Sequence, residues 1–455
     1  MQNFQESVWA HLEAKNIDRL KELLNNADEL DIINIMDELS NDEIVLIYRL
    51  LNKDMALEVF EKLDLNDQQN LINSFTEEKA IEVFKELGPD DRVRLLDELP
   101  AVVTRRMLAA LSEGDRADIS LIMGYEPETA GRLMTTEYVR LNKEWTAGEA
   151  LGKLRNIAKE KETIYTLYIT DTSKKLEGVL SLRELLVADP DAKISEIMQT
   201  SPIKVTTDTD QEEVANNLKK LELLALPVVD KEDRLVGIIT VDDAMDILED
   251  EATEDILASA GITDIASSET VRSEELIEGK LTTIWKMRLP ILGLTLIAGL
   301  MAGAVIDHFE ETLESVAIVA VFIPIIMDMG GSIGTQSSTI FARGLILGHI
   351  QTKSIWKHVL KESMVGLSLG IIAGSVTATA AYIWQGNLEL SIVLALSLAF
   401  TMTIAAFLGF VVPYVLVKLK FDQATGTGPV ITSIKDITGL MVYFLLVSFF
   451  LGHLM

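Results

Sequence analysis

The sequence predicts a multidomain protein with a soluble all-α domain, a soluble α/β domain and an all-α membrane domain. Three observations lead to this prediction. Apolar residues recur at helical spacing throughout residues 1–132, and strand-like and helix-like segments alternate over residues 133–253. After residue 283, five apolar segments of bilayer-spanning length follow one another.

The helical segment contains an internal repeat. Residues 56–67 return as residues 80–91, which is 24 positions later. A repeat this short predicts stacked short helices in a superhelical domain over residues 1–132. The second copy places Asp90 and Asp91 at a helix start, where they act either as N-terminal caps or as ligands of a cation.

A second duplication lies in the α/β segment. Residues 178–184 match residues 237–243, and each copy follows a strand, a charged turn and a second strand. This layout resembles a tandem CBS pair. The resemblance assigns the first CBS module to residues 133–198 and the second to residues 199–253.

The resemblance to CBS pairs also implies a ligand. In that family a hydroxyl and an acid of the repeated motif often hold the ribose of an adenine nucleotide such as ATP. The matching residues here are Thr240 and Asp243, whereas the first copy has Glu184 in place of the aspartate. A CBS pair that binds no nucleotide is the alternative.

A connecting segment at residues 254–282 is predicted to join the α/β domain to the membrane. Helical spacing from Asp246 to residue 280 gathers apolar side chains on one side and crowds carboxylates elsewhere. Acids four residues apart repel and destabilise a helix by about a few tenths of a kcal/mol per pair, and a bound divalent cation would remove that penalty. The pairs are Asp250 with Glu254 and Glu251 with Asp255. A solvated acidic face is the alternative interpretation.

The five apolar segments define a membrane domain over residues 283–455. Lys and Arg flank the first segment on its N-terminal side and occupy the loops after the second and fourth, whereas the other loops are acidic or neutral. The positive-inside rule then places the N-terminus in the cytoplasm and the C-terminus outside. We therefore expect a multi-pass protein of the cell (inner or plasma) membrane, in contact with the lipid bilayer.

Asp436 is the strongest candidate for an ion-binding residue. It lies inside the last apolar segment, and a carboxylate there costs roughly 2.5–3.5 kcal/mol on insertion scales, so such an acid is usually hidden from lipid and functional. Thr432 lies one helical turn before it and Gly428 two turns before it. These oxygen ligands suit Mg²⁺, which gives up its water reluctantly and needs few direct ligands. Lys435 either reaches the cytoplasmic interface or pairs with an acid of another subunit.

Asp328 is a second intramembrane acid. Gly330, Gly331 and Gly334 follow it, which predicts a broken helix at this point. Asp328 then either lines a permeation path or forms a structural pair, for which Arg343 is one candidate partner.

The domain order and several motifs resemble MgtE-type magnesium channels over essentially the whole chain. The most specific motifs are residues 207–215, 251–256, 329–338 and 428–439. The resemblance implies a homodimer with a pore on its two-fold axis and Asp436 as the ion site. It also implies that cytoplasmic Mg²⁺ closes the channel by bridging the N-terminal domain, the CBS pair and the connecting helix.

The resemblance and the acid positions together suggest a set of regulatory metal ligands. They are Asp90, Asp91, Glu213, Asp243, Asp246, Asp250, Glu251, Glu254 and Asp255. Four positions depart from the family pattern and leave the details of ion selectivity open. They are Ile291, Ser332, Gln423 and Gly428.

Composition narrows the function classes. The net charge of −30 lies entirely before Lys286, and such a surface repels nucleic acid and attracts metal cations. The absence of cysteine excludes disulfides and thiolate metal sites. No catalytic motif or ATPase signature is present, so we expect Mg²⁺ influx down its gradient and no enzyme. A proton-coupled divalent-cation carrier and a membrane-anchored Mg²⁺ or nucleotide sensor without transport are the alternatives.

Overall fold

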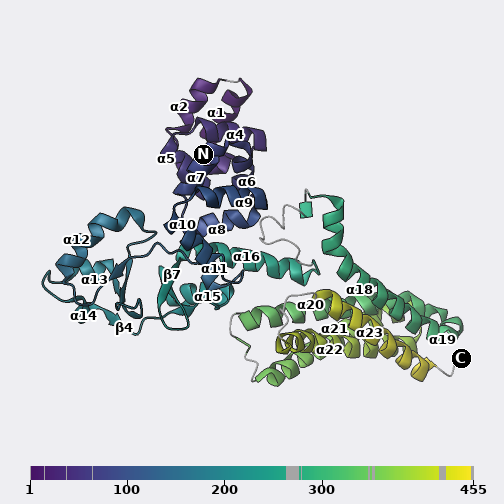
Figure 1. Ribbon diagram of the computed structural model, residues 1–455. Coiled ribbons are helices and arrows are strands. Elements are labelled where there is room, and N and C mark those ends of the chain that lie inside the picture. Colours follow the sequence, from purple (N-terminus) through teal and green to yellow (C-terminus); the bar gives the residue numbers. More distant parts are fainter. Residues whose placement is uncertain are drawn as a thin grey trace. The chain divides into compact units, whose positions relative to one another are not determined.

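The computed structural model describes residues 2–14, 16–36, 38–63, 65–262, 276–277, 279–346, 349–350, 354–419 and 427–451. The chain forms two compact units, one made mainly by residues up to Glu251 and the other mainly by residues from Ala252 onward (Figure 1). The first unit contains the all-α and α/β parts, and the second contains the long apolar helices.

Short helices fill the first part of the soluble unit, as the sequence predicts. Buried aliphatic and aromatic side chains form a continuous core along these helices. The helices are α1 (Gln2–Glu13), α2 (Ile17–Leu24), α3 (Glu29–Met36), α4 (Asn41–Leu50), α5 (Lys53–Glu61), α6 (Leu65–Ser74), α7 (Glu77–Glu86), α8 (Pro89–Glu98), α9 (Ala101–Ala110) and α10 (Glu113–Ile122).

The 24-residue repeat corresponds to one pair of short helices. Helices α5, α7 and α9 begin 24 residues apart, and so do α6, α8 and α10. Early in the second helix of each pair, a polar side chain donates a hydrogen bond back to a carbonyl of the first helix. These bonds join Gln68 to Phe60 (2.8 Å), Arg92 to Phe84 (3.0 Å) and Arg116 to Leu108 (2.9 Å). The repeat predicted from the sequence is therefore confirmed.

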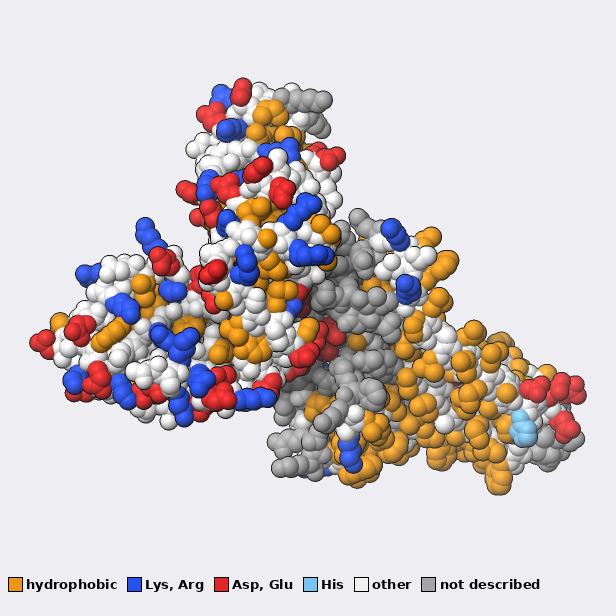
Figure 2. Space-filling model, in the orientation of Figure 1, with side chains coloured by type: hydrophobic (Ala, Val, Ile, Leu, Met, Phe, Trp, Pro, Cys, Tyr) orange, Lys and Arg blue, Asp and Glu red, His pale blue; other side chains and the backbone are white. Residues whose placement is uncertain are grey.

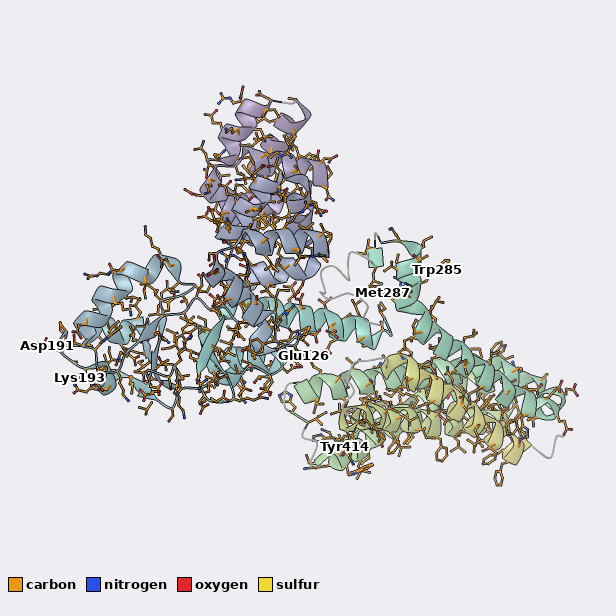
Figure 3. The ribbon with its side chains drawn as sticks, viewed as in Figure 1. Glu126, Asp191, Lys193, Trp285, Met287 and Tyr414 are labelled. Carbon is orange, nitrogen blue, oxygen red and sulfur yellow. The ribbon has the colours of Figure 1, made fainter. Side chains whose placement is uncertain are left out.

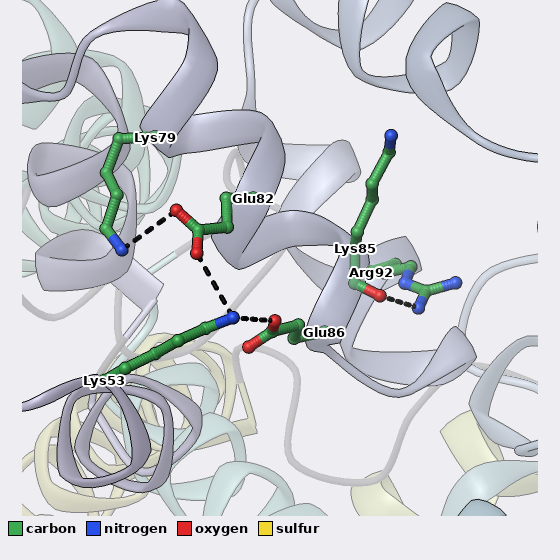
Figure 4. Close-up of polar contacts among 6 residues, drawn as sticks. All are labelled: Lys53, Lys79, Glu82, Lys85, Glu86 and Arg92. Atoms are coloured by element: carbon green, nitrogen blue, oxygen red, sulfur yellow. Dashed lines mark hydrogen bonds and ion pairs between the residues drawn. The ribbon is translucent and has the colours of Figure 1, made fainter.

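Surface ion pairs join neighbouring repeats. Lys53 Nζ lies 3.2 Å from Glu82 Oε1 and 2.6 Å from Glu86 Oε1, and so links α5 to α7 (Figure 4). Lys79 Nζ lies 3.2 Å from Glu82 Oε2. Because exposed pairs contribute only about 0–1 kcal/mol each, the apolar core is the main support of the stack.

Two small sheets form the α/β part, and each contains a hairpin preceded by a short parallel strand. The hairpins β2–β3 and β6–β7 shift register at equivalent positions, after Ile169 and after Val228, so the duplication in the sequence is also present in the backbone. The first half contains α11 (Ala130–Leu133), β1 (Arg140–Leu141), α12 (Ala147–Ile157), η1 (Ala158–Glu160), β2 (Thr166–Thr170), β3 (Leu176–Ser181), α13 (Leu182–Val187), α14 (Ile194–Ile197) and β4 (Gln199–Thr200). The second half contains β5 (Val205–Thr206), α15 (Gln211–Leu221), β6 (Ala225–Val229) and β7 (Leu235–Thr240).

Helix α16 (Val241–Ser259) follows β7 directly. The connecting helix is predicted over residues 254–282, with helical spacing that begins earlier, at Asp246. The described helix ends at Ser259, and residues 263–275 lie outside the described residues. Within the membrane unit, a Cβ at Gly261 would lie 2.5 Å from Ile291 Cγ2 and 2.9 Å from Pro429 Cγ. The chain after α16 therefore packs against α18 and the first turn of α23.

The described part of the membrane unit contains five candidate spans, which confirms the prediction. Hydrophobic side chains cover much of its visible surface (Figure 2). The spans involve α18 (Leu281–His308), α20 (Ile323–Ile346), α21 (Ile355–Gln385), α22 (Leu388–Lys418) and α23 (Thr427–Leu451), with α19 (Glu310–Ser315) and the 3₁₀ segment η2 (Ala317–Phe322) between the first two. Trp285 lies in the first turns of α18 and Tyr414 near the end of α22, the helix ends where amphipathic rings usually mark a membrane interface (Figure 3).

Small residues set the packing of the spans. A Cβ at Gly366, Gly370 or Gly374 of α21 would lie 2.6, 2.7 or 2.6 Å from atoms of α22. Side chains larger than hydrogen would push these two helices apart. Helix α22 is the most buried of the five candidate spans.

The predicted break in α20 is wrong. The helix continues without interruption through Gly330, Gly331 and Gly334, and the irregular stretch lies earlier, in η2. These glycines face neighbouring helices: a Cβ at Gly334, for example, would lie 3.1 Å from Ile431 Cγ2 of α23. Glycine allows close packing here and does not interrupt the helix.

Candidate ion-binding sites

Asp436 and its neighbour Lys435 form an ion pair within the last span. Lys435 Nζ lies 2.6 Å from Asp436 Oδ1 and donates a hydrogen bond to Met327 O of α20 at 2.5 Å. The lysine side chain is 5% exposed and the aspartate side chain 22% exposed. The ammonium group therefore turns sideways toward α20 of its own chain, which does not match an extension to the membrane interface, while a pairing with an acid of another subunit stays a prediction.

Thr432 and Gly428 lie on α23 at the predicted positions before Asp436. Thr432 is partly exposed. A Cβ at Gly428 would lie 2.8 Å from the carbonyl oxygen of Ser259, the last residue of α16. The first turn of α23 therefore meets the end of the connecting helix within the membrane unit.

A stripe of exposed polar side chains runs along α20. Its members recur at intervals of three and four residues and so share one helix face. They are Asp328, Ser332, Thr335, Gln336 and Thr339. Because Lys435 bonds to Met327 O, Asp436 lies near the level of Asp328 on this stripe.

Asp328 and Arg343 do not pair within one chain. They are fifteen residues apart on the uninterrupted helix α20, which separates them by about 22 Å along its axis. The pairing of Asp328 with Arg343 is therefore wrong for a single chain. Asp328 is exposed, and both a place on a permeation path and a structural pairing with another residue stay predictions.

Carboxylates from three segments gather in the soluble unit, and we call them the α8–α16 acidic cluster. The cluster consists of Asp90 and Asp91 in the first turn of α8, Glu162 after η1, and Asp242, Asp243 and Asp246 in the first turns of α16. Asp90 Oδ1, Asp91 Oδ2 and Glu162 Oε2 lie 2.9, 3.7 and 3.8 Å from the position of a Cβ on Gly88, so three carboxylates converge on one small space.

Asp90 is the most buried member of the cluster. Its side chain belongs to a residue that is 7% exposed, and Oδ1 has no hydrogen-bond partner among the described residues. Burial, followed by the charges of Asp243 and Asp91, raises the pKa of Asp90 well above its usual range. A buried carboxylate with an oxygen left without a partner is unfavourable unless it binds a proton or a cation.

Two other carboxyl groups of the cluster also have raised pKa values. Loss of solvent around the carboxyl group, followed by the charges of Asp243 and Asp91, raises the pKa of Glu162 to about 7, although Glu162 is an exposed residue. Burial raises the pKa of Asp243 to about 6, against the opposing hydrogen bond from Thr240. Arg94 supplies positive charge, with Nη1 at 4.0 Å from Asp91 Oδ1 and 3.8 Å from Asp246 Oδ2. One arginine does not balance six acids.

The cluster fits a hydrated divalent cation. Within the described ranges, no three acidic or histidine side chains form a group that could hold a bare metal ion. The unsatisfied Asp90 oxygen and the converging carboxylates suit Mg²⁺ that keeps its water shell, as this ion commonly does.

The structure brings together the predicted residues Asp90, Asp91, Asp243 and Asp246, while their role as metal ligands stays a prediction. Glu162 was missed by the sequence reasoning. It lies in the irregular stretch between η1 and β2, where no periodicity or motif distinguishes it. Only the three-dimensional approach to Gly88 reveals it.

The remaining predicted acids lie on or near α16. Asp250, Glu251, Glu254 and Asp255 share this helix and are each partly buried. Gln211 of α15 contacts Glu251, because its Nε2 donates a hydrogen bond to Glu251 Oε1 at 2.5 Å. Glu213 is exposed and, two positions further along α15, points about 200° away from Gln211. The structure therefore does not bring Glu213 to Glu251.

Thr240 and Asp243 form a local pair at the start of α16. Thr240 Oγ1 donates to Asp243 Oδ2 at 2.5 Å, and Ser181 Oγ donates to Glu184 Oε2 at 2.8 Å in the first copy. Both pairs stabilise a helix start, which is a structural role. Their role in nucleotide binding stays a prediction.

A five-span membrane domain with an aspartate and a lysine paired inside it, joined to a highly acidic soluble unit, is the architecture of a divalent-cation transporter. The family model described as "Divalent cation transporter" matches residues 323–446. The models for the MgtE intracellular N domain and for the CBS domain match residues 27–128, 130–191 and 194–250. The chain belongs to the MgtE family of magnesium transporters and is not an enzyme.

Relatives match the chain over nearly its full length. The magnesium transporter MgtE of Thermus thermophilus is 36% identical over 433 residues, covering 93% of each chain. That of Bacillus subtilis is 32% identical and covers 95% of this chain and 96% of its own. Among solved structures, the cytosolic domain of the Mg²⁺ channel MgtE in complex with ATP is 38% identical, with a TM-score of 0.50, over 53% of this chain and 99% of that one.

Proposed function

We propose that this magnesium transporter is a Mg²⁺-selective channel for influx, whose ion path passes Asp436. The observation that supports this proposal is the polar stripe on α20 beside Asp436 on α23. Lipid offers no partners for such a stripe, so it must face water or protein. A cation that crosses a membrane needs a negatively charged ligand and polar groups in contact with water, and Asp436 and the stripe provide both in this proposal.

A second copy of the chain completes the path in this proposal. In a two-fold symmetric homodimer, two copies of the stripe face each other, and one carboxylate of Asp436 comes from each subunit. Asp328, Thr432 and the carbonyl of Gly428 line the same path and contact the water shell of Mg²⁺. The N-terminus is cytoplasmic and the C-terminus lies outside, as the flanking charges require.

Cytoplasmic Mg²⁺ closes the channel in this proposal. The ion binds the α8–α16 acidic cluster, with Asp90, Asp91, Asp243 and Asp246 among its ligands, and a further ion relieves the repulsion among the acids of α16. Without metal, the crowded carboxylates repel and loosen the soluble unit. The contact of Ser259 and Gly261 with the first turn of α23 supports a mechanical link from α16 to the pore.

An adenine nucleotide is a second proposed ligand of the soluble unit. A 38% identical relative was solved with ATP bound to its cytosolic domain. Thr240 and Asp243 are our candidates for the ribose contact. Since Asp243 also belongs to the acidic cluster, nucleotide and Mg²⁺ would influence each other's binding.

The test is Mg²⁺ current in inside-out patches of wild type, Asp436→Asn and the control Asp307→Asn. Asp307 is an exposed acid at the end of α18. We expect current in wild type and the control, steep closure as cytoplasmic Mg²⁺ rises, and loss of current in Asp436→Asn. Saturable, pH-dependent uptake without current would support a proton-coupled carrier, and no uptake at all would refute transport.

A further inference from the structure

Lys435 is a buried cation beside the proposed ion site, and no motif assigns it a role. Its side chain is 5% exposed, and Nζ contacts both Asp436 Oδ1 at 2.6 Å and Met327 O at 2.5 Å. A lysine near a membrane surface would normally extend its flexible stem to water. Lys435 lies eight residues into α23, about 12 Å along the axis from Thr427, and extends its ammonium group sideways to α20.

Helix α20 has a glycine where the ammonium group of Lys435 lies against it. A Cβ at Gly331 would lie 2.7 Å from Lys435 Nζ and 3.4 Å from Cε, and a Cβ at Gly330 would lie 3.5 Å from Cδ. An alanine at position 331 would therefore collide with the charged end of the lysine. Gly331, which does not break the helix, therefore forms a cradle for a charged side chain inside the membrane unit, while Gly330 lies in ordinary contact with the lysine stem.

The two members of the ion pair differ in accessibility. Asp436 keeps 22% of its side chain exposed, whereas Lys435 keeps 5%. A cation can therefore approach the open side of the carboxylate while the ammonium group stays behind it against α20. The approaching ion is attracted by the carboxylate and repelled by the ammonium charge at the same time.

We propose that Lys435 is a tethered counter-charge that weakens cation binding at Asp436 and so sets the affinity and release rate of the transporter. This inference rests on the proposed role of Asp436 as the ion site. Two unpaired carboxylates in a dimeric pore would hold a divalent cation tightly, and conduction requires binding weak enough for the ion to leave. One lysine per carboxylate brings the fixed charge of the site to zero.

The first test replaces the charge and keeps the stem. In Lys435→Met, reconstituted in liposomes, the external Mg²⁺ concentration at half-maximal uptake should fall by at least about tenfold, because a unit charge close to the ion has been removed. Maximal flux should fall, since a tightly held ion leaves slowly. Na⁺ flux in the absence of divalent cations should rise, because two unneutralised carboxylates attract monovalent ions as well. Lys418→Met, which removes an exposed lysine at the end of α22, is the matched control and should change none of these values.

The second test moves the ammonium group without removing it. Gly331→Ala should displace Nζ from Asp436 and shift the half-maximal Mg²⁺ concentration in the same direction as Lys435→Met. In the double variant, Gly331→Ala should add no further shift, because the group with which it collides is absent. Additive shifts would contradict the cradle.

A purely structural role for Lys435 predicts a different result. If the lysine only fastens α23 to α20, Lys435→Met lowers the thermal unfolding midpoint of the full-length protein but leaves the half-maximal Mg²⁺ concentration and the Na⁺ flux unchanged, and that result overturns the proposal. Asp436→Asn is measured alongside. Wild-type transport by Asp436→Asn would refute the ion site itself, whereas lost transport there with unchanged affinity in Lys435→Met would refute only the counter-charge.

Discussion

Asp90 shows how one residue links metal binding to stability. Its carboxylate is buried, has an oxygen without a hydrogen-bond partner among the described residues, and lies beside Asp91 and Asp243. In the absence of metal, the charge of this group is unfavourable. The buried charge of Asp90 becomes favourable when a divalent cation binds and neutralises the cluster.

We therefore expect Asp90→Asn to stabilise the metal-free protein by about 1–3 kcal/mol, since the isosteric amide needs neither a poorly solvated charge nor the proton uptake that the raised pKa of Asp90 implies. The stabilisation that saturating Mg²⁺ gives to wild type should shrink in this variant. Thermal unfolding of the full-length protein with a chelator and with Mg²⁺ measures both effects. Glu113→Gln, an exposed acid in the first turn of α10, should behave like wild type. Equal Mg²⁺ stabilisation in wild type and Asp90→Asn would contradict the cluster as a metal site.

Single residues differ in how far the sequence can identify them. Asp436 is visible because an acid in an apolar run is unusual at the level of the sequence itself. Glu162 is one acid among many in an acidic region, and Gly331 is one of three glycines in a short stretch. Their importance comes from neighbours far away in the chain, at Gly88 and Lys435, and no local pattern encodes that approach.

At the scale of elements, the helix pairs of the N-terminal part contain a repeated polar contact that differs in burial from copy to copy. Arg92 is 6% exposed and bonds to the carbonyls of Phe84 and Lys85 (the Lys85 bond at 2.6 Å is drawn in Figure 4). Arg116 makes the equivalent bond to Leu108 but is exposed. We expect the contribution of this contact to stability to depend on how deeply the arginine is buried.

We expect Arg92→Met to destabilise the soluble unit by about 2–3 kcal/mol, because buried carbonyls lose charged donors. Arg116→Met should cost less than about 1 kcal/mol, since water can replace the donor there. Proteolysis of the full-length protein across a urea series measures both. Equal costs at the two positions would show that the repeat, and not burial, determines the strength of the contact.

Helices and strands could be predicted from the sequence where a single periodicity of apolar residues indicated one type of element. The helix pairs, the duplicated hairpins and the five spans all follow from spacing and hydropathy. The predicted break in α20 failed because glycine has two roles in membrane helices, as an interruption and as a site of close packing. Which role applies depends on the facing helix, here α23 through Ile431 and Lys435.

At the scale of the whole molecule, the separation of charge was visible in the sequence and predicts the overall behaviour. The net charge of −30 lies in the soluble part, and the structure concentrates part of it in the α8–α16 acidic cluster. Repulsion among these negative charges lowers the stability of the folded chain, and any ligand that neutralises the carboxylates raises it. Protons and divalent cations should therefore compete for the same groups.

This competition has a defined direction. The pKa of Glu162 is raised to about 7 and that of Asp243 to about 6, above the ordinary range of carboxyl groups. Between about pH 4.5 and about pH 7, the folded metal-free protein binds more protons than the unfolded chain, so its stability falls as the pH rises through this window. Bound Mg²⁺ replaces those protons. The stabilisation by saturating Mg²⁺ should therefore be small near about pH 5 and largest above about pH 7. Unfolding midpoints of the full-length protein, with a chelator and with Mg²⁺ across this range, measure it. A Mg²⁺ effect independent of pH would mean that the ion binds groups other than these carboxylates.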